Sequence, residues 1–374
     1  MTRVATALDS PHPQPDAAAP AMEGLEGIVQ AWIRRSQPSR VEPQRIASLE
    51  PRPLADGLAV AVCTLARPEP LRQSLTSIAA QTRRPDQVVI VDASEGDASE
   101  RVVREAADGG LSGVPIAYVR VARPRAGLTR QRNLALALAE RRLIAFFDDD
   151  VTLAPACLAE LEAARRESSP APVGVGALVE GRAANGPTAI WLVRRFLRMV
   201  PNLEPGRYCR TGMSTPWSFV RQGSGVIRGD WLPGYAMMWD TALARELRFD
   251  ESFAGYAQSE DLEFSLRAGR RGAILLACAA RVADTHAPAG RPNDYKMGYM
   301  AIYNRFLVHR RGVPGRSPKD VALFAYAWSL DTLLLLRHLV HPGRWGMALR
   351  QFAGRARAAA DLIRGAGRSG TGMA

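Results

Sequence analysis

Continuous apolar runs alternate with amphipathic segments over the middle of the chain. The apolar runs fall at 58–64, 88–94, 116–121 and 143–150. Segments with apolar residues at helical spacing lie between or after them: one that Pro68 opens, and others at about 98–108, 129–141 and 154–167. Apolar strands without polar alternation, joined by helical crossovers, are typical of a parallel sheet buried on both faces. The pattern therefore predicts an α/β, Rossmann-like domain with a mostly parallel central sheet.

The two ends of the chain have a different character. Residues 1–55 are rich in Pro, Ala and polar side chains, which predicts a flexible leader. A short helix within it is compatible with four apolar residues that share one helical face: Leu25, Ile28, Val29 and Trp32. After about residue 290, apolar helical stretches are followed by a basic amphipathic tail. We expect an α/β domain at 56–290 and a helical, basic segment at 291–374.

The net charge of +12 favours an anionic partner, such as nucleic acid, a membrane surface or a phosphorylated ligand. The arginines are scattered and no nucleic-acid-binding motif is present, so we expect no nucleic-acid partner. Four cysteines without metal-type spacing, and no secretory signal, favour the reducing cytoplasm. The longest apolar stretch, Val321 to Leu336, is shorter than the roughly 20 residues of a spanning helix. We therefore expect a cytoplasmic protein that can contact the inner face of the cell membrane through its C-terminal segment.

Three consecutive carboxylates, Asp148 to Asp150, directly follow the strand at 143–150. Parallel sheets bind ligands at the carboxyl ends of their strands, and like charges gather there only when a cation or hydrogen-bond donors compensate them. Asp148 and Asp150 could both face Mg²⁺ or Mn²⁺, which prefer carboxylate oxygen and bridge phosphate oxygens. The alternative is structural, because Asp150 could simply cap the following helix.

Other polar residues lie at the same predicted edge. Thr64 and Arg67 follow the first strand, and Asp92 ends the second, where it could accept hydrogen bonds from a base or ribose or form a strand-ending turn. Arg132 and Asn133 precede the fourth strand and could neutralise phosphates, although arginines on a helix face are usually only solvated.

A second acidic segment begins at Glu260 and Asp261. Glu260, Glu263 and Arg267 lie on one side of a predicted helix, which is compatible with a surface salt-bridge ladder. Asp261 lies on another face of that helix. His286 follows a short strand-like run, and a lone histidine is more often structural than a metal ligand.

Taken in order, these segments resemble the family-2 glycosyltransferases of the GT-A fold. The resemblance covers about residues 58 to 290. It rests on the following segments: the opening strand with Thr64 and Arg67, VDAS (91–94), GLTRQRN (127–133), Asp148-x-Asp150, PGYAMM (233–238), RFDESF (248–253), SEDLEFSLRAGRRG (259–272), and His286. The sequence departs from the family at Ala93 and Ser94, where a second acidic residue and a glycine are common, and this leaves the donor base open.

The resemblance implies a metal-dependent, inverting transfer of a hexosyl or deoxyhexosyl group from a nucleotide-diphosphate sugar to an acceptor hydroxyl. It assigns the nucleoside base to Asp92, the ribose or metal to Asp148, the metal to Asp150, and the acceptor hydroxyl to Asp261, with Glu260 as a competing base. The expected donor-binding set is Thr64, Arg67, Asp92, Arg132, Asn133, Asp148 and Asp149, and the expected metal ligands are Asp148, Asp150 and His286. A glycan or lipid-linked acceptor in surface polysaccharide or glycolipid assembly fits this reaction.

Two other enzyme classes share parts of the pattern. A nicotinamide-dependent oxidoreductase has the same alternation, but CTLARPEP (63–70) stands where its GxGxxG motif would follow the first strand. A nucleotidyltransferase could use the same aspartates, but it would leave the segment at Glu260 and His286 without a role.

Overall fold

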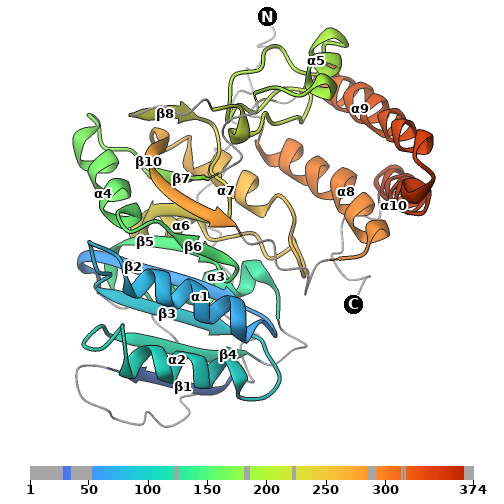
Figure 1. Cartoon of the computed structure of the whole chain (residues 1–374). Coiled ribbons are helices and arrows are strands. Elements are labelled where there is room, and N and C mark those ends of the chain that lie inside the picture. The colour runs from blue at the N-terminus through green and yellow to red at the C-terminus, as the bar shows by residue number, and fades with distance from the viewer. Residues whose placement is uncertain are drawn as a thin grey trace, which may run out of the picture.

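The computed structural model describes residues 28–34, 53–121, 126–180, 186–220, 225–284, 292–312, 315 and 317–365, with residues 28–34 described as backbone only. Within these residues one mixed sheet forms the centre of the molecule, in the order β1-β4-β3-β2-β5-β9-β7-β10-β6, with β8 paired to β10 (Figure 1). The strands are β1 (Ile28–Arg34), β2 (Ala55–Thr64), β3 (Gln87–Asp92), β4 (Ile116–Val121), β5 (Arg141–Asp148), β6 (Val151–Leu153), β7 (Gly174–Val179), β8 (Val226–Gly229), β9 (Ala236–Asp240) and β10 (Ile274–Asp284).

Between residues 55 and 167 the helices follow the strands in the alternation that the sequence predicts. The helices are α1 (Pro68–Ala79), α2 (Ala98–Asp108), α3 (Leu128–Leu138), α4 (Cys157–Glu167), α5 (Ala189–Phe196), α6 (Thr241–Leu247), α7 (Glu260–Ala268), α8 (Asp294–Gly312), α9 (Pro318–Leu333) and α10 (Trp345–Ile363), with short 3₁₀ turns η3 (Trp217–Phe219), η4 (Leu334–Val340) and η5 (Pro342–Arg344). The structure confirms the α/β class, the parallel arrangement of β4, β3, β2 and β5, and the helical C-terminal segment.

Helix α3 ends at Leu138, earlier than the expected boundary at 141. The buried side chain of Gln87 explains this boundary. Its Nε2 donates to the carbonyl of Leu138 over 3.1 Å, and its Oε1 accepts from the N–H of Glu140 over 2.7 Å. One side chain thus provides hydrogen-bond partners for the backbone carbonyl at the end of α3 and for the backbone N–H just before β5.

Both faces of the parallel strands are covered, as the unbroken apolar runs require. Leu58, Val60 and Val62 of β2 pack with the buried residues of α1, α2 and α4, whereas Ala59 and Ala61 pack with those of α3, α6 and α7. Burying one such leucine or valine contributes roughly 1.5–3 kcal/mol. The carboxyl ends of the strands therefore project from a rigid, two-sided core.

The short helix expected around residues 25–32 is not formed, because residues 28–34 are strand β1. This segment runs antiparallel to β4, with Trp32 opposite Tyr118 and Arg34 opposite Ile116. Backbone pairing explains the difference, since β4 would otherwise present a row of unpaired N–H and C=O groups at the sheet edge. The rest of the expected leader, 1–27 and 35–52, lies outside the described residues.

The C-terminal helices attach to the sheet domain through α8. Leu307 and Val308 of α8 pack with Leu262 of α7 and with Phe253 in the loop before it. Helices α8, α9 and α10 lie on the side of the molecule away from β1 to β4 (Figure 1). In the part of the chain that the structure describes, no helix is both long and apolar enough to cross a membrane.

Candidate active site

The carboxyl ends of three neighbouring parallel strands meet at one edge of the sheet. In the register of β2 and β3, Thr64 lies opposite Asp92, and in that of β2 and β5, Cys63 lies opposite Asp148. The turn of Asp149 and Asp150 follows β5 directly. The strand ends that the sequence singled out are therefore brought together at the edge where such sheets bind ligands.

Thr64 and Arg67 hold the acidic turn in place. The Thr64 hydroxyl donates to Asp149 over 2.7 Å, and Nη1 of Arg67 donates to Asp149 over 3.0 Å and to Asp150 over 3.2 Å. Asp149 is only 4% exposed, and burial raises the pKa of its carboxyl. Of these three predicted donor-binding residues, Thr64 and Arg67 thus both contact Asp149, which anchors the turn that also carries Asp148 and Asp150.

Asp92 is fully buried at the end of β3. Its carboxylate accepts one hydrogen bond from the Tyr118 hydroxyl and one from the backbone N–H of Ser94, both over 2.8 Å. Burial and the nearby Asp92 charge raise the pKa of Tyr118. The Ser94 contact is the strand-ending turn of the structural alternative. Asp92 is 0% exposed and both its oxygens accept hydrogen bonds, so a nucleoside base could reach this carboxylate only after these contacts rearranged.

Arg132 of α3 is a buried cation between two groups of carboxylates. Its side chain is 2% exposed and donates to Glu260 over 2.6 Å, to the Gly234 carbonyl over 2.8 Å and, more weakly, to Asp148 over 3.4 Å. The guanidinium also lies 5.9 Å from the ring centre of Phe146 and 5.4 Å from that of Phe249. The sequence predicts that Arg132 contacts the donor phosphates. In the structure Arg132 also joins Asp148 at the end of β5 to Glu260 of α7.

Glu260 and Asp261 open α7 and face different partners. Burial and the neighbouring Asp261 charge raise the pKa of Glu260 to about 8, and Arg132 offsets part of this effect. Asp261 is half-buried, and its two oxygens accept from the backbone N–H groups of Gly234, over 2.8 Å, and Leu262, over 2.7 Å. Backbone donors therefore orient the Asp261 carboxylate, while Glu260 is committed to Arg132.

Gly234 is the point at which these side chains converge. A Cβ atom added there would lie 3.1 Å from both Nη2 of Arg132 and Oε1 of Glu260, and 3.2 Å from Cβ of Asp261. Contacts this short require the neighbours to shift. The absence of a side chain at Gly234 is therefore what allows the backbone of the 233–238 segment to contact both ends of the site.

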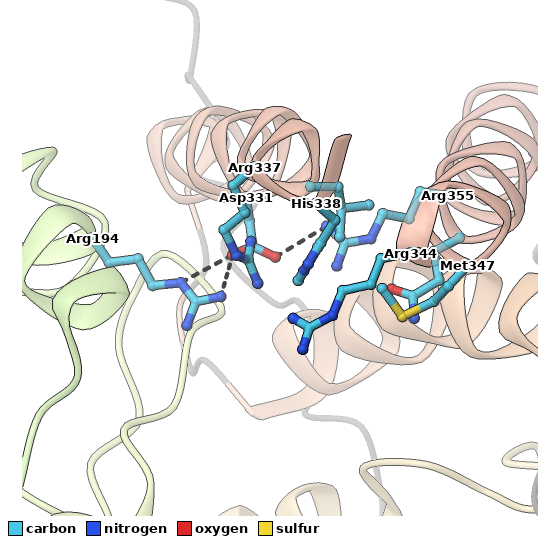
Figure 2. Close-up of a pocket in the computed structure, with 9 residues that line it drawn as sticks. Arg194, Asp331, Arg337, His338, Arg344, Met347 and Arg355 are labelled. Atoms are coloured by element: carbon cyan, nitrogen blue, oxygen red, sulfur yellow. Dashed lines mark hydrogen bonds and ion pairs between the residues drawn. The ribbon is translucent and has the colours of Figure 1, made fainter. Parts of the chain in front are cut away.

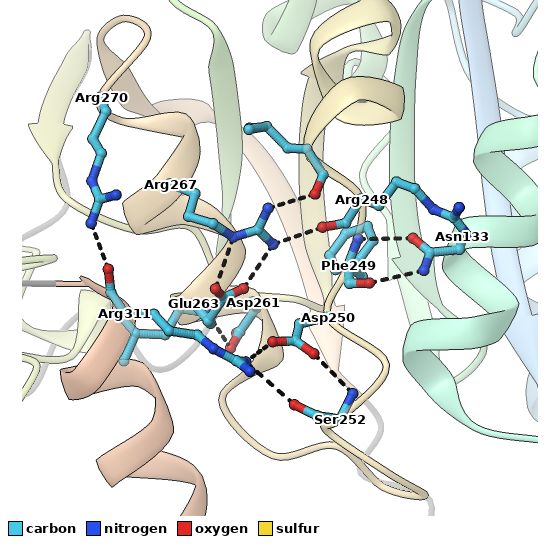
Figure 3. A network of polar contacts seen from close by, with 12 residues as sticks. Asn133, Arg248, Phe249, Asp250, Ser252, Asp261, Glu263, Arg267, Arg270 and Arg311 are labelled. Carbon is cyan, nitrogen blue, oxygen red and sulfur yellow. Dashed lines mark hydrogen bonds and ion pairs between the residues drawn. The ribbon is translucent and has the colours of Figure 1, made fainter. Parts of the chain in front are cut away.

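The expected ladder on α7 is present only in part (Figure 3). Arg267 forms a two-pronged ion pair with Glu263, with both distances 2.8 Å, and it also donates to the carbonyls of Leu247 and Arg248, both over 2.6 Å. Glu263 is 1% exposed, so this pair is buried rather than on the surface. Glu260 does not join the ladder because it pairs with Arg132.

Asn133 secures the segment that precedes α7 (Figure 3). Its amide nitrogen donates to the Phe249 carbonyl and to Glu251, both over 2.9 Å, and its oxygen accepts from the Phe249 N–H over 2.8 Å. A contact of Asn133 with the sugar donor, as the sequence predicts, would have to replace one of these bonds. In the structure Asn133 has a positioning role.

Asp148 and Asp150 are the aspartates that could hold a divalent cation. The side chain of Asp148 is 40% exposed and that of Asp150 is 11% exposed. Partial desolvation by the surrounding protein, together with the charges of Asp150, Asp149 and Asp261, raises the pKa of Asp148 above its usual value, against the opposing effect of Arg132. Crowded carboxylate oxygens of this kind suit a hard cation.

Within the described residues, no group of three or more His, Cys, Asp or Glu side chains could hold a metal ion. His286, the third expected ligand, lies outside the described residues. The aspartates therefore fit Mg²⁺ or Mn²⁺ in chemistry, and a cation there would take its remaining ligands from water, phosphate oxygens or residues that are not described.

Sequence reasoning missed the pairing of Arg132 with Glu260, the cover of Tyr118 over Asp92 and the convergence at Gly234. The first two join residues far apart in the chain, for which local spacing carries no signal. Gly234 did fall within a recognised motif, PGYAMM, although the reason for a glycine there required the contacts.

One comparison with known proteins matches the part of the chain that carries the strand-end residues. Residues 59–180 match the sequence model of the family described as Glycosyl transferase family 2. The match includes β2 to β7 and the acidic turn, and it ends before α7. No curated protein matches the chain.

Several solved structures have a similar overall arrangement at low sequence identity. TarS of S. aureus, as a chain of residues 1–349, is 16% identical with a TM-score of 0.48, and the alignment covers 81% of this chain and 82% of that one. The mannosyltransferase PcManGT of Pyrobaculum calidifontis, solved with GDP-Man and Mn²⁺, is 18% identical with a TM-score of 0.47, covering 85% and 81%. GalNAc-T7, solved with UDP, GalNAc and Mn²⁺, is 14% identical with a TM-score of 0.49, covering 76% and 58%.

Proposed function

We propose that this chain, a glycosyltransferase whose residues 59–180 form a family 2 domain, moves a hexosyl or deoxyhexosyl group from a nucleotide-diphosphate sugar to an acceptor hydroxyl with inversion. The observation that carries the proposal is the convergence of Asp148, Arg132 and the Glu260–Asp261 pair beside the carboxyl ends of the parallel strands. In this arrangement Asp148 would lie on the diphosphate side of a donor, where it could hold a cation, and Asp261 would lie on the acceptor side.

The donor would lie along the strand ends. Asp148 and Asp150 would hold Mg²⁺ or Mn²⁺, with His286 as a further ligand, and the bound cation would neutralise the diphosphate as it leaves. Thr64, Arg67 and Asp149 fix the turn that carries these aspartates. Asp92 would receive the nucleoside base once the Tyr118 hydroxyl gives way.

Asp261 is the group we assign as the general base. The acceptor hydroxyl attacks the anomeric carbon from the face opposite the diphosphate, and Asp261 takes its proton as the new bond forms. Two backbone N–H groups hold this half-buried carboxylate in place. Glu260 suits the role less well, because it is buried and its Oε1 already accepts from Arg132.

The acceptor we propose is a glycan or lipid-linked sugar in surface polysaccharide or glycolipid assembly, used at the inner face of the membrane. Four apolar side chains share one face of α10 by helical spacing and remain 49, 62, 44 and 87% exposed: Trp345, Leu349, Phe352 and Ile363. An exposed apolar stripe on a basic helix is typical of helices that lie in the membrane interface. Loss of vesicle binding in the double variant Leu349→Gln, Phe352→Gln, with Tyr326→Gln as a control on α9, would support this contact. Unchanged binding would exclude it.

The experiment that tests the transferase assignment is a panel of nucleotide-diphosphate sugars incubated with the purified chain, with and without Mn²⁺. We expect one donor to be hydrolysed slowly, and the anomeric configuration of the first product, followed by NMR, to be inverted. Retention of configuration would contradict the inverting mechanism, and no turnover of any donor with any offered acceptor would contradict the proposed donor class.

A further inference from the structure

A basic pocket lies in the C-terminal helical region, away from the strand-end carboxylates. Its volume is about 520 Å³, and it lies between α5, the end of α9 with η4, and the start of α10 (Figure 2). None of its lining residues belongs to β2, β3, β5 or α7. Its charged or titratable lining consists of Arg194, Asp331, Arg337, His338, Arg344 and Arg355. The pocket is therefore distinct from the site described above.

Positive charge exceeds negative charge in this pocket. Asp331 is the one carboxylate among the lining residues that the structure describes, and both its oxygens are used. Oδ1 accepts from Arg194 over 3.0 and 2.6 Å, and Oδ2 accepts from Arg355 over 3.0 Å. The guanidinium groups of Arg337 and Arg344 add two further positive charges.

Arg355 has a buried N–H group without an acceptor. Its side chain is 9% exposed, and its Nε atom has no hydrogen-bond partner among the described residues. A buried guanidinium N–H without an acceptor is costly, and a ligand oxygen or water is the usual remedy. Arg344 and Arg355 point into the same space from α10 and the turn before it (Figure 2).

The pKa shifts of two lining residues also reflect the excess of positive charge in the pocket. Partial desolvation lowers the pKa of Arg337, and the charges of Arg194, Arg355 and Arg344 lower it further against the opposing charge of Asp331. Burial and the charges of Arg337 and Arg344 also lower the pKa of His338. A ligand with several anionic oxygens would relieve this repulsion, and guanidinium groups match phosphate oxygens in geometry.

We propose that this pocket binds the phosphate group of an anionic phospholipid. The elements that form the pocket also expose apolar side chains close in sequence to its lining residues. Phe196 of α5 is 85% exposed, and Leu336 and Val340 of η4 are 51 and 75% exposed. Basic and apolar side chains on the same elements suit a lipid headgroup and its acyl region together. The inference deepens the membrane contact proposed above and does not depend on glycosyl transfer.

The test uses the full chain and flotation with vesicles of phosphatidylcholine, alone or mixed with phosphatidylglycerol. The pocket variant is Arg337→Gln, Arg344→Gln. The matched control is Arg310→Gln, Arg364→Gln, which removes the same charge from two exposed positions that line no part of the pocket. We expect the pocket variant to bind the anionic vesicles at least about tenfold more weakly than the control does.

Equal losses in the two variants would mean that only the general surface charge acts, and would overturn the proposal. A second arm measures the thermal unfolding midpoint in inorganic phosphate against chloride at equal ionic strength. Phosphate could stabilise the wild type but not the pocket variant, while the pocket variant and the control bind anionic vesicles equally. This result would assign the pocket to a soluble anion and overturn the proposal of a lipid.

Both arginines are exposed, so the pocket variant should fold, and Arg344→Gln alone serves if it does not. Donor hydrolysis should be unchanged in the pocket variant. A failure here is thus distinguishable from a failure of the proposed transferase activity.

Discussion

Arg132 on α3 and Glu260 on α7 are 128 positions apart in the sequence and are joined by a buried hydrogen bond of 2.6 Å. The same guanidinium reaches Asp148 at the end of β5 over 3.4 Å. One buried cation therefore links the strand-end aspartates to the helix that carries the proposed base. We expect the relative position of the proposed donor side and the proposed acceptor side to depend on this arginine.

The first prediction concerns this link. Arg132→Met should destabilise the protein by about 3 kcal/mol, because buried Glu260 and the Gly234 carbonyl both lose their hydrogen-bond donor. The raised pKa of Glu260 favours its protonated form, which keeps the cost from being larger because no isolated charge is left buried. Urea unfolding at pH 7 measures the change. The control Arg130→Met removes an arginine that is 47% exposed and should cost less than about 1 kcal/mol. Equal effects of the two variants would contradict the structural role of Arg132.

The second prediction concerns the base. Asp261→Asn should lower kcat by about 10²–10⁴-fold while the donor affinity stays nearly constant, because the amide cannot accept the proton. Glu260→Gln should have a milder effect, since an amide oxygen can still accept from Arg132. Steady-state kinetics and donor binding by calorimetry measure the two quantities. The reverse ranking would move the role to Glu260, and full activity of both variants would exclude a carboxylate base in this segment.

The third prediction concerns the glycine between these groups. Gly234→Ala should cost about 1–3 kcal/mol of stability and lower kcat, because its Cβ would press on Arg132, Glu260 and Asp261 at 3.1 to 3.2 Å. Gly343→Ala is the matched control, since a Cβ there meets nothing within 4 Å. Thermal unfolding and kcat should be close to wild type in the control. A fully active, equally stable Gly234→Ala would show that the site tolerates movement at this point.

The parallel half of the fold could be predicted because its signal is local. The six consecutive buried residues of β3 appear in the sequence as an unbroken apolar run. Helix α1 appears as apolar residues at helical spacing after a proline. The strand β1 could not be predicted in this way. Its partner is the edge of β4, and an edge pairing is not encoded in the spacing of residues 28–34 themselves.

The sequence predicted which strand ends lie together, but it did not predict the contacts of their side chains. Strand ends pointed to Asp92 and Asp148, and their register places them at one edge. Whether a carboxylate is open or covered depends on residues elsewhere in the chain, such as Tyr118 for Asp92. The prediction that Arg132 contacts phosphate also rested on local sequence alone, which gives no sign of its carboxylate partner Glu260 on α7.

The fourth prediction concerns the metal. EDTA should abolish transfer and Mg²⁺ or Mn²⁺ should restore it, because Asp148 and Asp150 are the carboxylates proposed to hold the cation. Asp150→Asn should lower turnover strongly without unfolding the protein, as circular dichroism would show. Asp56→Asn, at a side chain that is 93% exposed, is the control and should keep full activity. Full activity in chelator would contradict metal dependence.

The fifth prediction concerns the pH dependence of stability at the start of α9. Asp320 and Ser317 form a reciprocal capping box, and Asp320 also accepts from Arg210 over 2.9 Å. Hydrogen bonds from the backbone and hydroxyl of Ser317, together with the Arg210 charge, hold the pKa of Asp320 below its usual value. A carboxyl whose pKa is lower in the folded than in the unfolded chain stabilises the fold above its unfolded pKa of about 3.9. That contribution is lost as the pH falls through the lower, folded value.

Asp320→Asn should therefore unfold at a lower temperature than the wild type at pH 7, and the difference between the two proteins should shrink below about pH 4. Thermal unfolding of both proteins across this pH range measures it. Arg210→Gln should have the smaller effect at pH 7, because Arg210 is 70% exposed and contributes less to the lowered pKa than Ser317 does. A difference between wild type and Asp320→Asn that stayed constant from pH 7 to acid would show that the ionised carboxylate does not stabilise this helix start.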